Sequence, residues 1–595
     1  MEEIKYVDQP LKEYDSYKSL HTEKTKEYFD KLVEKSQINV EENKALNKKI
    51  EQNQDKASKE SSTLKKLKFG KAVNIIIIVL AALTIIGSSV AIHLIKSQTA
   101  FTNSSYLGPS LALSFSIVIF IALIIVQILV INKRIKQRAQ ILAQLNEKIS
   151  SQIQKAYEQL APLVDMFKFG MKLTIFNQTM PFVKLDKYFS NEKLAKLKEE
   201  YGFVPKDSNE SMVVGLQSGS IYGNPFVYKR DLNHKLGTKT YYGSITISWV
   251  TYVLNSEGRR VPHTHTQTLT ASLDKPYPYY SGKTTLLFGS HAAPDLSFKR
   301  EAQKIHALTE KQRAKLVKNT EKILKKRQEK QTSFTALSNT KFETYWNALD
   351  RDNEQQYRLL FTPLAQNNIC ELLTDNEKGY GDDFSFRKLR EMNFIRSESL
   401  TDFEFIEDLQ RLKDYNFDRI QNEFNRQNSE YFKHIYFSLA PYFSIPIYQQ
   451  TKSLDFIYKD WSKGKMSKYE HEYQLSFLDR DLFKHRKVKT EIIMKTQFID
   501  NKDGFENLKV HSFGYDIVPR TEYVLMRGGD GKMHNVPVHW DEYIRYDNEV
   551  KAKIHPMESL MSDENYAEEF FEFDGKHPEQ SASKLMTLNA LVNVI

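Results

Sequence analysis

The sequence contains a single cysteine, Cys370, among its 595 residues. One thiol excludes an intramolecular disulfide framework, and it excludes zinc or iron–sulfur centres built from several thiolates. Cys370 lies in the apolar stretch NNICELL, where an isolated cysteine is usually buried and unreactive. We therefore expect neither a cysteine nucleophile nor a cofactor.

The recognised catalytic motifs are also missing. The sequence has no Gly-x-Ser-x-Gly elbow and no His-Glu-x-x-His helix. The stretch SGKTT at Ser281–Thr285 resembles the end of a phosphate-binding loop, but Tyr277 stands where such a loop requires glycine. These absences favour a protein without enzymatic activity.

No cleavable signal peptide is expected, because the first fifteen residues are acidic and polar. Hydrophobic residues make up 41% of the chain, as in a soluble protein, so any membrane-embedded part is an anchor. The net charge of +10 is modest for this length. Abundant lysine, asparagine, isoleucine, tyrosine and phenylalanine indicate an AT-rich bacterial genome.

Two long apolar runs organise the sequence, Ala72–Ile95 and Ser110–Ile131. Each exceeds the roughly 20 apolar residues needed to cross a hydrocarbon core about 30 Å thick. Because the core offers no water, each run must satisfy its backbone hydrogen bonds internally as a helix. The sequence therefore predicts a transmembrane helical hairpin in the lipid bilayer.

Basic residues flank both outer ends of this hairpin, whereas the connecting loop 96–109 holds one lysine and no arginine. This asymmetry predicts that both termini and the main body are cytoplasmic, in a cell-membrane protein with two spans. The membrane-flanking residues are Lys65, Lys66, Lys68, Lys71, Lys133, Arg134, Lys136 and Arg138.

The hairpin is flanked by segments with helical periodicity. Residues 1–70 are highly charged with a thin apolar stripe, which is typical of a solvated helical arm or a partial coiled coil, with disorder as the alternative. In residues 133–165 apolar residues recur every three or four positions, which predicts a helical stalk with a packing seam. The seam either lies against the arm or joins two copies in a homodimer.

The segment 166–295 favours strands. Tyr241–Leu254 and Val261–Leu273 are rich in β-branched and aromatic residues and predict an antiparallel hairpin, with a further strand at Thr284–Gly289. His263 and His265 lie two apart on one predicted strand and so share a face, as paired metal ligands must. A third ligand would come from the remaining candidates, namely His234, His291, Asp295 or another carboxylate. A second, scattered set comprises His511, His534 and His539.

Residues 299–330 are strongly basic, with twelve Lys or Arg against four Glu, and predict a helix. Such a helix is either a solvated surface or a site for anionic lipid, to which each basic residue near the surface contributes about 1 kcal/mol. Nucleic acid is unlikely as a partner because stacking aromatics are missing. The predicted anionic-surface residues are Lys315, Lys318, Lys322, Lys325, Lys326 and Arg327.

The residues after this insertion resemble a known family. Phe342-Glu343, Trp346, Asp352 and the run Leu359–Pro363 follow the family's order, and GDDFSFRKLR at Gly381–Arg390 falls where it has a strand. The chain resembles the uncharacterised bacterial membrane proteins with two transmembrane helices and a cytosolic α+β domain, often encoded near LemA-type proteins. The resemblance covers about residues 70–395 and implies architecture, without catalytic residues.

The C-terminal third predicts helix at 400–440, β-structure at 465–550 with glycine-rich turns, and an apolar terminal helix in SKLMTLNALVNVI. The expected fold class is α+β, with a transmembrane helical hairpin and stalk followed by antiparallel-sheet domains and helical segments. The predicted parts are an arm at 1–70, the hairpin at 71–132, the stalk at 133–165, an α+β domain at 166–395 with a basic insertion at 296–333, a helical segment at 396–450, a β-rich domain at 451–550, and an acidic tail with the terminal helix at 551–595.

Three functions remain open from the sequence. The first is a membrane-anchored, cytoplasm-facing scaffold or recruitment protein. The second is an accessory subunit of a membrane transport or secretion complex, whose hairpin would pack closely through its small residues, Gly87, Ser88, Ser89, Ser114 and Ser116. The third is a metal-dependent enzyme built around His263 and His265.

Overall fold

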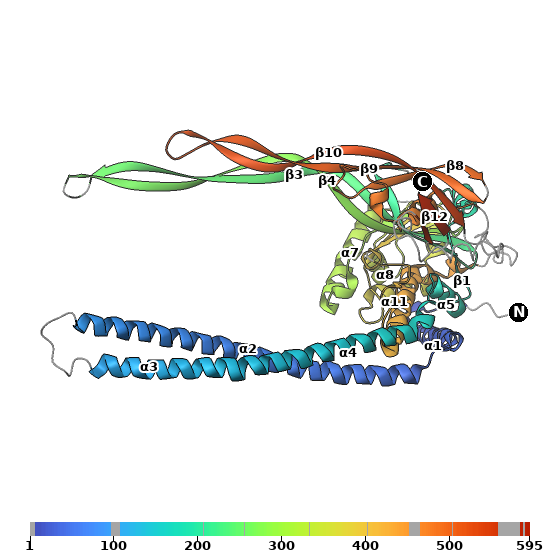
Figure 1. Cartoon of the computed structure of the whole chain (residues 1–595). Coiled ribbons are helices and arrows are strands. Elements are labelled where there is room, and N and C mark those ends of the chain that lie inside the picture. The colour runs from blue at the N-terminus through green and yellow to red at the C-terminus, as the bar shows by residue number, and fades with distance from the viewer. Residues whose placement is uncertain are drawn as a thin grey trace. The chain divides into compact units, whose positions relative to one another are not determined.

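The computed structural model describes residues 6–96, 107–205, 208–254, 256, 258–331, 334–401, 403–450, 465–502, 504–556, 584–586 and 590–594 (Figure 1). The chain is an α+β protein with antiparallel sheets and two long apolar helices. It divides into two compact units, and the division falls inside helices α1 (Pro10–Ser36) and α11 (Phe417–Phe443). Unit 1 comprises 1–28, 168–408 and 425–595, and unit 2 comprises 29–167 and 409–424.

Unit 2 is an antiparallel pair of long helices. Its elements are α2 (Val40–Lys96), α3 (Leu107–Ile125), the π-helix η2 (Val126–Asn132) and α4 (Lys133–Val164). Phe29, Phe167 and Phe424 pack together at its base, with Phe29 and Phe424 rings 5.2 Å apart. Because α3, η2 and α4 follow one another without a gap, the second span of the predicted hairpin continues into the predicted stalk as one helical rod.

Unit 1 contains a seven-stranded antiparallel sheet of strand order β1-β2-β3-β4-β7-β6-β5. Its strands are β1 (Val183–Leu185), β2 (Ser211–Ile221), β3 (Asn224–Leu254), β4 (Arg260–Gly289), β5 (Ser297–Arg300), β6 (Phe384–Leu389) and β7 (Met392–Ser397). The predicted strands at 241–254, 261–273 and 284–289 are confirmed as parts of β3 and β4.

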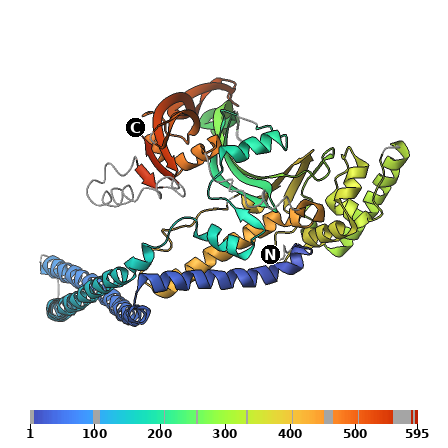
Figure 2. The ribbon, with the colours of Figure 1, turned by 90° about the vertical axis from the view of Figure 1, so that its right-hand side faces the viewer.

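Helices cover one face of this sheet. Figure 2 shows α11 and the first half of α1 on that face. The ring of Tyr442 on α11 lies 4.4 Å from Phe288 of β4, and Tyr14 of α1 stacks with Phe432. The other helices of this unit are α5 (Met171–Thr179), α6 (Asn191–Glu199), α7 (Glu310–Lys330), α8 (Thr340–Trp346), α9 (Glu354–Leu360), α10 (Pro363–Thr374) and α13 (Lys468–Leu475).

A second sheet has strand order β11-β12-β10-β9-β8. Its strands are β8 (Ile493–Lys502), β9 (Phe505–Arg527), β10 (Met533–Pro556), β11 (Lys584–Met586) and β12 (Ala590–Val594). Strands β9 and β10 extend into a ribbon that packs on the longer β3–β4 ribbon, and Figure 1 shows the β3–β4 ribbon reaching further. Leu269, Val536 and Val538 are buried between the two ribbons.

The short helix α13 joins the two sheets through consecutive buried polar residues. Glu470 accepts a hydrogen bond from the Phe189 amide, which precedes α6. His471 pairs with Glu506 of β9 at 2.6 Å. Glu472 accepts from the Val213 amide of β2 and from Lys495 of β8. One helical turn therefore ties both sheets together.

Three predicted segments differ from the structure. The C-terminal helix is wrong, because the described residues of that segment form β11 and β12, and β12 pairs with β10. The α-helix of the basic insertion begins at Glu310, since Ser297–Arg300 are the edge strand β5 and only a short 3-10 helix, Ile305–Ala307, lies between them. The helix predicted from residue 400 begins at Phe417. The predicted acidic run 563–575 lies outside the described residues.

Candidate functional site

The helical hairpin is held in register by polar pairs across its two helices. Residues later in α2 pair with residues earlier in the second half of the hairpin, as an antiparallel arrangement requires. The hydrogen-bonded pairs are Asn53–Gln152 at 2.9 Å, Glu60–Arg138 at 2.7 Å, Asn74–Gln127 at 2.7 Å and Thr84–Ser116 at 3.1 Å. The loop between the spans lies outside the described residues, but these pairs fix how the spans align.

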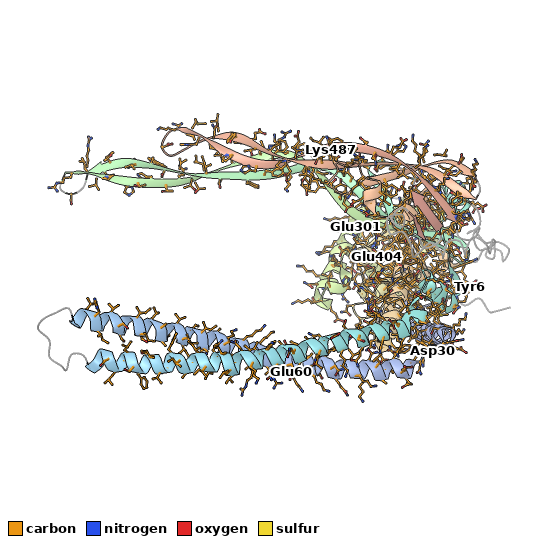
Figure 3. The ribbon with its side chains drawn as sticks, in the orientation of Figure 1. Tyr6, Asp30, Glu60, Glu301, Glu404 and Lys487 are labelled. Carbon is orange, nitrogen blue, oxygen red and sulfur yellow. The ribbon has the colours of Figure 1, made fainter. Side chains whose placement is uncertain are left out.

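The distal part of the hairpin exposes apolar side chains on all sides. Figure 3 shows side chains projecting along its whole length. More than half of each of the following side chains is exposed: Ile76, Leu83, Ile86, Phe115, Val118 and Leu129. Such a surface is unfavourable in water and matches a hydrocarbon environment. The two helices are long and apolar enough to cross a membrane.

Basic residues from both helices form a belt at one level of the hairpin. The pair Asn74–Gln127 lies on the apolar side of the belt, and Glu60–Arg138 lies at its other edge. A separation of fourteen helical residues corresponds to about 21 Å. Seven of the eight flanking residues are exposed, and Lys71 is partly buried. Members of the belt are Lys65, Lys66, Lys68, Lys71, Lys133, Arg134, Lys136 and Arg138.

The small residues of the hairpin do not form one packing stripe. Only Ser116 bonds across the helix pair, by accepting from Thr84. Ser89 and Ser114 donate to carbonyl groups of their own helices, and an added Cβ at Gly87 would meet no atom within 4 Å. Ser88 is partly buried. Gly87 and Ser89 instead belong to the exposed surface.

The seam of the stalk is filled within the chain. Ile149 and Ala156 of α4 are buried against Ile50 and Ala57 of α2. The prediction that the stalk packs on the arm is confirmed for these residues. The homodimer stays a prediction, and it would need a surface other than this seam.

His263 and His265 lie on one face of the β3–β4 ribbon, as their spacing predicts. His263 Nδ1 is 3.3 Å from His265 Nε2, and His265 also bonds Thr251 of the opposite strand. The other candidate ligands have partners elsewhere: His234 pairs with Glu210, His291 with Glu391, Asp295 with Gln356, His511 with Glu549, His534 with Asp530 and His539 with Thr521. No group of three or more metal-ligating side chains occurs among the described residues.

Helix α7 carries a stripe of lysines. It begins with a capping box between Thr309 and Gln312, and its apolar side buries Leu324. Lysines repeat every three or four residues on the exposed side, at Lys311, Lys315, Lys318, Lys322, Lys325 and Lys326. Arg327, which the sequence placed in this set, is partly buried with its guanidinium 4.5 Å from the Phe334 ring.

Cys370 is buried in α10, and burial raises the pKa of its thiol to about 12. It is therefore protonated at neutral pH and is not a nucleophile. The residues that carry the family resemblance make structural contacts within unit 1. Glu343 forms a buried two-bond pair with Arg351, Trp346 is fully buried, and Asp352 accepts from the Ser297 amide.

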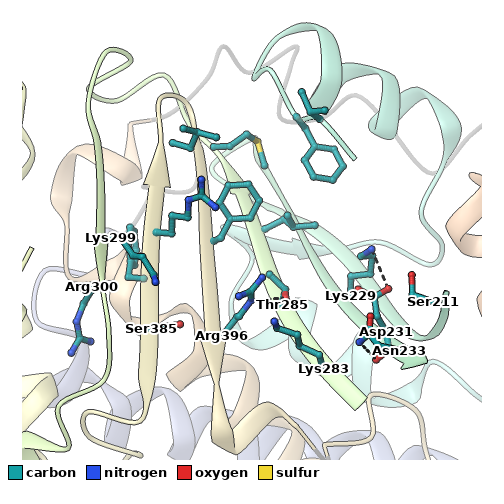
Figure 4. Close-up of a pocket in the computed structure, with 18 of the residues that line it drawn as sticks. Ser211, Lys229, Asp231, Asn233, Lys283, Thr285, Lys299, Arg300, Ser385 and Arg396 are labelled. Atoms are coloured by element: carbon teal, nitrogen blue, oxygen red, sulfur yellow. Dashed lines mark hydrogen bonds and ion pairs between the residues drawn. The ribbon is translucent and has the colours of Figure 1, made fainter. Parts of the chain in front are cut away.

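The sequence did not predict a cavity of about 750 Å³ on the sheet face opposite α11 (Figure 4). Cross-strand register brings its lining together. Lys229 lies opposite Thr285, Arg396 opposite Ser385, and Arg387 opposite both Phe394 and Lys299. Arg396 donates to Thr285 at 3.4 Å. These residues come from five strands, so their spacing in the sequence gave no signal.

Comparisons with family models, curated proteins and solved structures find no match to this chain. The resemblance to the two-span bacterial family therefore stays a prediction.

Proposed function

We propose that the chain is a membrane-anchored scaffold or recruitment protein that holds unit 1 at the cytoplasmic face of a bacterial cell membrane. The observation that carries this proposal is the basic belt beside the exposed apolar part of the hairpin. Positive residues concentrate on the cytoplasmic side of short-looped membrane proteins. Both flanking segments contribute to one belt, so both termini belong on that side.

Two surfaces of unit 1 support a recruitment role. The β3–β4 ribbon extends beyond the β9–β10 turn, where the Gly529 amide bonds Gln267. Its end exposes Val250, Tyr252, Val253, Leu254 and Val261, and exposed apolar patches of this kind mark protein contact sites. The lysine stripe of α7 supplies a second surface, suited to anionic lipid.

Crosslinking in intact cells, followed by mass spectrometry of the copurified proteins, tests the proposal. One variant exchanges residues 72–131 for an unrelated two-span anchor. A second replaces the ribbon end, Tyr252→Ser with Leu254→Ser. Its matched control is Thr266→Ser with Thr268→Ser, at exposed positions on the same face of the ribbon but away from its end. A scaffold keeps its crosslinked partners after the anchor exchange and loses them in the ribbon-end variant.

Loss of all partners in the anchor exchange, with retention in the ribbon-end variant, would contradict the scaffold role and favour the accessory-subunit alternative. The lysine stripe has a separate test. The full chain is placed in neutral nanodiscs and sedimented with vesicles of phosphatidylglycerol. The triple variant Lys315→Glu, Lys318→Glu, Lys322→Glu should bind these vesicles more weakly than the wild type. Unchanged binding would remove α7 from the proposal.

A further inference from the structure

Like charges face one another in the sheet-face cavity. Arg387 of β6 lies directly opposite Lys299 of β5, and opposed residues have Cβ atoms about 5 Å apart. Arg396 lies one register row away on β7. Burial and then the charge of Arg396 lower the pKa of Lys283, and the charge of Asp231 opposes this shift. Like charges in such positions are destabilising. The arrangement costs stability unless another group compensates it.

The carboxylates of the cavity compensate only part of this positive charge. Asp231 pairs with Lys229 at 3.1 Å, and Glu301 pairs with Lys299 at 2.6 Å between exposed side chains. Arg300 faces away and is paired with the buried Asp382. Lys283 lies directly opposite Asp231, so this one carboxylate is shared between Lys229 and Lys283. Within the part of the chain that the structure describes, Arg387 and Arg396 have no carboxylate partner.

The remaining walls are apolar or carry hydroxyl groups. Phe394 lies beside Arg387 and opposite Leu287, while Val204 is 81% exposed at the rim. Thr285 and Ser385 supply hydroxyls near Arg396, and Figure 4 shows Ser211 further along the cavity, beside Asp231 and Asn233. Arginine pairs and hydroxyls are suited to bidentate recognition of phosphate. A volume of about 750 Å³ falls in the range of small-molecule sites.

We propose that this cavity binds an organic phosphate, with the phosphate on Arg387, Arg396 and Lys283 and an apolar or aromatic body against Phe394 and Leu287. The site lies wholly within unit 1 and does not depend on the proposed scaffold role. The same chemistry occurs in a soluble nucleotide and in the headgroup of a lipid phosphate monoester, and the test separates these sources.

Lysine footprinting of the full chain in phosphatidylcholine nanodiscs provides a readout at the site. The chain is acetylated with acetic anhydride, and modification of Lys283 is compared with that of the exposed Lys532 between β9 and β10. The soluble probes are pyrophosphate and adenosine diphosphate. The lipid probe is phosphatidic acid incorporated into the nanodisc. The proposal expects at least one organic phosphate to protect Lys283 while Lys532 stays reactive.

Arg387→Gln with Arg396→Gln removes two of the phosphate contacts at exposed positions. Charge-assisted hydrogen bonds of this kind carry enough energy that the variant should weaken protection by about tenfold or more. The control, Lys502→Gln with Lys551→Gln at exposed positions of the second sheet, removes the same charge outside the cavity and should leave protection unchanged. Thermal melting of each variant checks that it is folded.

Protection by adenosine diphosphate at lower concentration than by pyrophosphate assigns a soluble ligand, and protection by phosphatidic acid alone assigns a lipid. Protection of Lys283 by neither organic phosphate overturns the proposal. So does equal protection of Lys283 and Lys532, or equal weakening by both double variants, because each would show non-specific charge attraction. Protection by pyrophosphate alone overturns the assignment of an apolar body.

Discussion

Asn74 Nδ2 donates a hydrogen bond of 2.7 Å to Gln127 Oε1 inside the apolar hairpin, and it also donates to the Leu123 carbonyl at 3.3 Å. Both side chains are buried between the two helices. In hydrocarbon neither group has water as an alternative partner. The pair therefore fixes the register of the spans where they enter the basic belt.

Asn74→Leu should destabilise the hairpin by about 1 kcal/mol, the usual size of a polar contact between membrane helices. Gln127→Leu should cost a similar amount. Each single change leaves the other polar group without its hydrogen-bond partner. The double variant should therefore lose less stability than the sum of the two single losses. Unfolding by sodium dodecyl sulfate in mixed micelles measures the cycle. Strict additivity would show that the two side chains do not interact.

Arg351→Met should destabilise unit 1 by about 3–5 kcal/mol, because it leaves the Glu343 carboxylate buried without its cation. Arg351 bonds both oxygens of Glu343, at 2.7 and 2.8 Å, and its guanidinium lies 4.0 Å from the centre of the Tyr357 ring. Adding Glu343→Leu should restore part of the loss. Thermal melting measures all three forms. A stable single variant would show that Glu343 is not held by this pair.

Glu470 makes the stability of unit 1 depend on pH. Burial raises the pKa of its carboxyl from 4.5 to about 7, so the folded chain holds the proton more tightly than the unfolded chain. Stability should therefore fall as pH rises from 4.5 to 7, by about 3 kcal/mol at most. Glu470→Gln removes this contribution, so its stability should decline less over that window.

Urea unfolding at pH 5 and pH 8 measures the difference between the wild type and Glu470→Gln. The control is Glu192→Gln, which changes an exposed carboxyl on α6. Parallel pH profiles for the wild type and Glu470→Gln would show that Glu470 does not carry the dependence.

At Gly243 on β3 the backbones of the two ribbons approach each other closely. A Cβ at this position would lie 2.0 Å from the Pro537 carbonyl oxygen of β10, so no side chain fits without separating the ribbons. Gly243→Val should increase hydrogen exchange of amides in 241–249 and 536–541. Gly282→Ala, where an added Cβ meets no atom, serves as the control. Unchanged exchange in Gly243→Val would contradict the packing.

The sequence was sufficient to predict the two long apolar helices, since two uncharged apolar runs of more than twenty residues favour helices long enough to cross a membrane. It also indicated the shared face of His263 and His265, because side chains two apart on a strand point the same way. It failed at Ala590–Val594, where a short apolar run fits a helix or a strand equally and only pairing with β10 decides. The cavity depends on the register of five strands, which local spacing does not encode.

The central claim is that the hairpin crosses the membrane with unit 1 on the cytoplasmic side. A thiol reagent that does not cross membranes tests it in intact cells, after Cys370→Ser removes the native thiol. Ser104→Cys marks the loop between the spans, and Lys318→Cys marks α7. The account predicts that the protein is recovered with membranes, that Ser104→Cys reacts in intact cells, and that Lys318→Cys reacts only after the cells are opened. Reaction of Lys318→Cys in intact cells, or recovery of the chain in the soluble fraction, would contradict it.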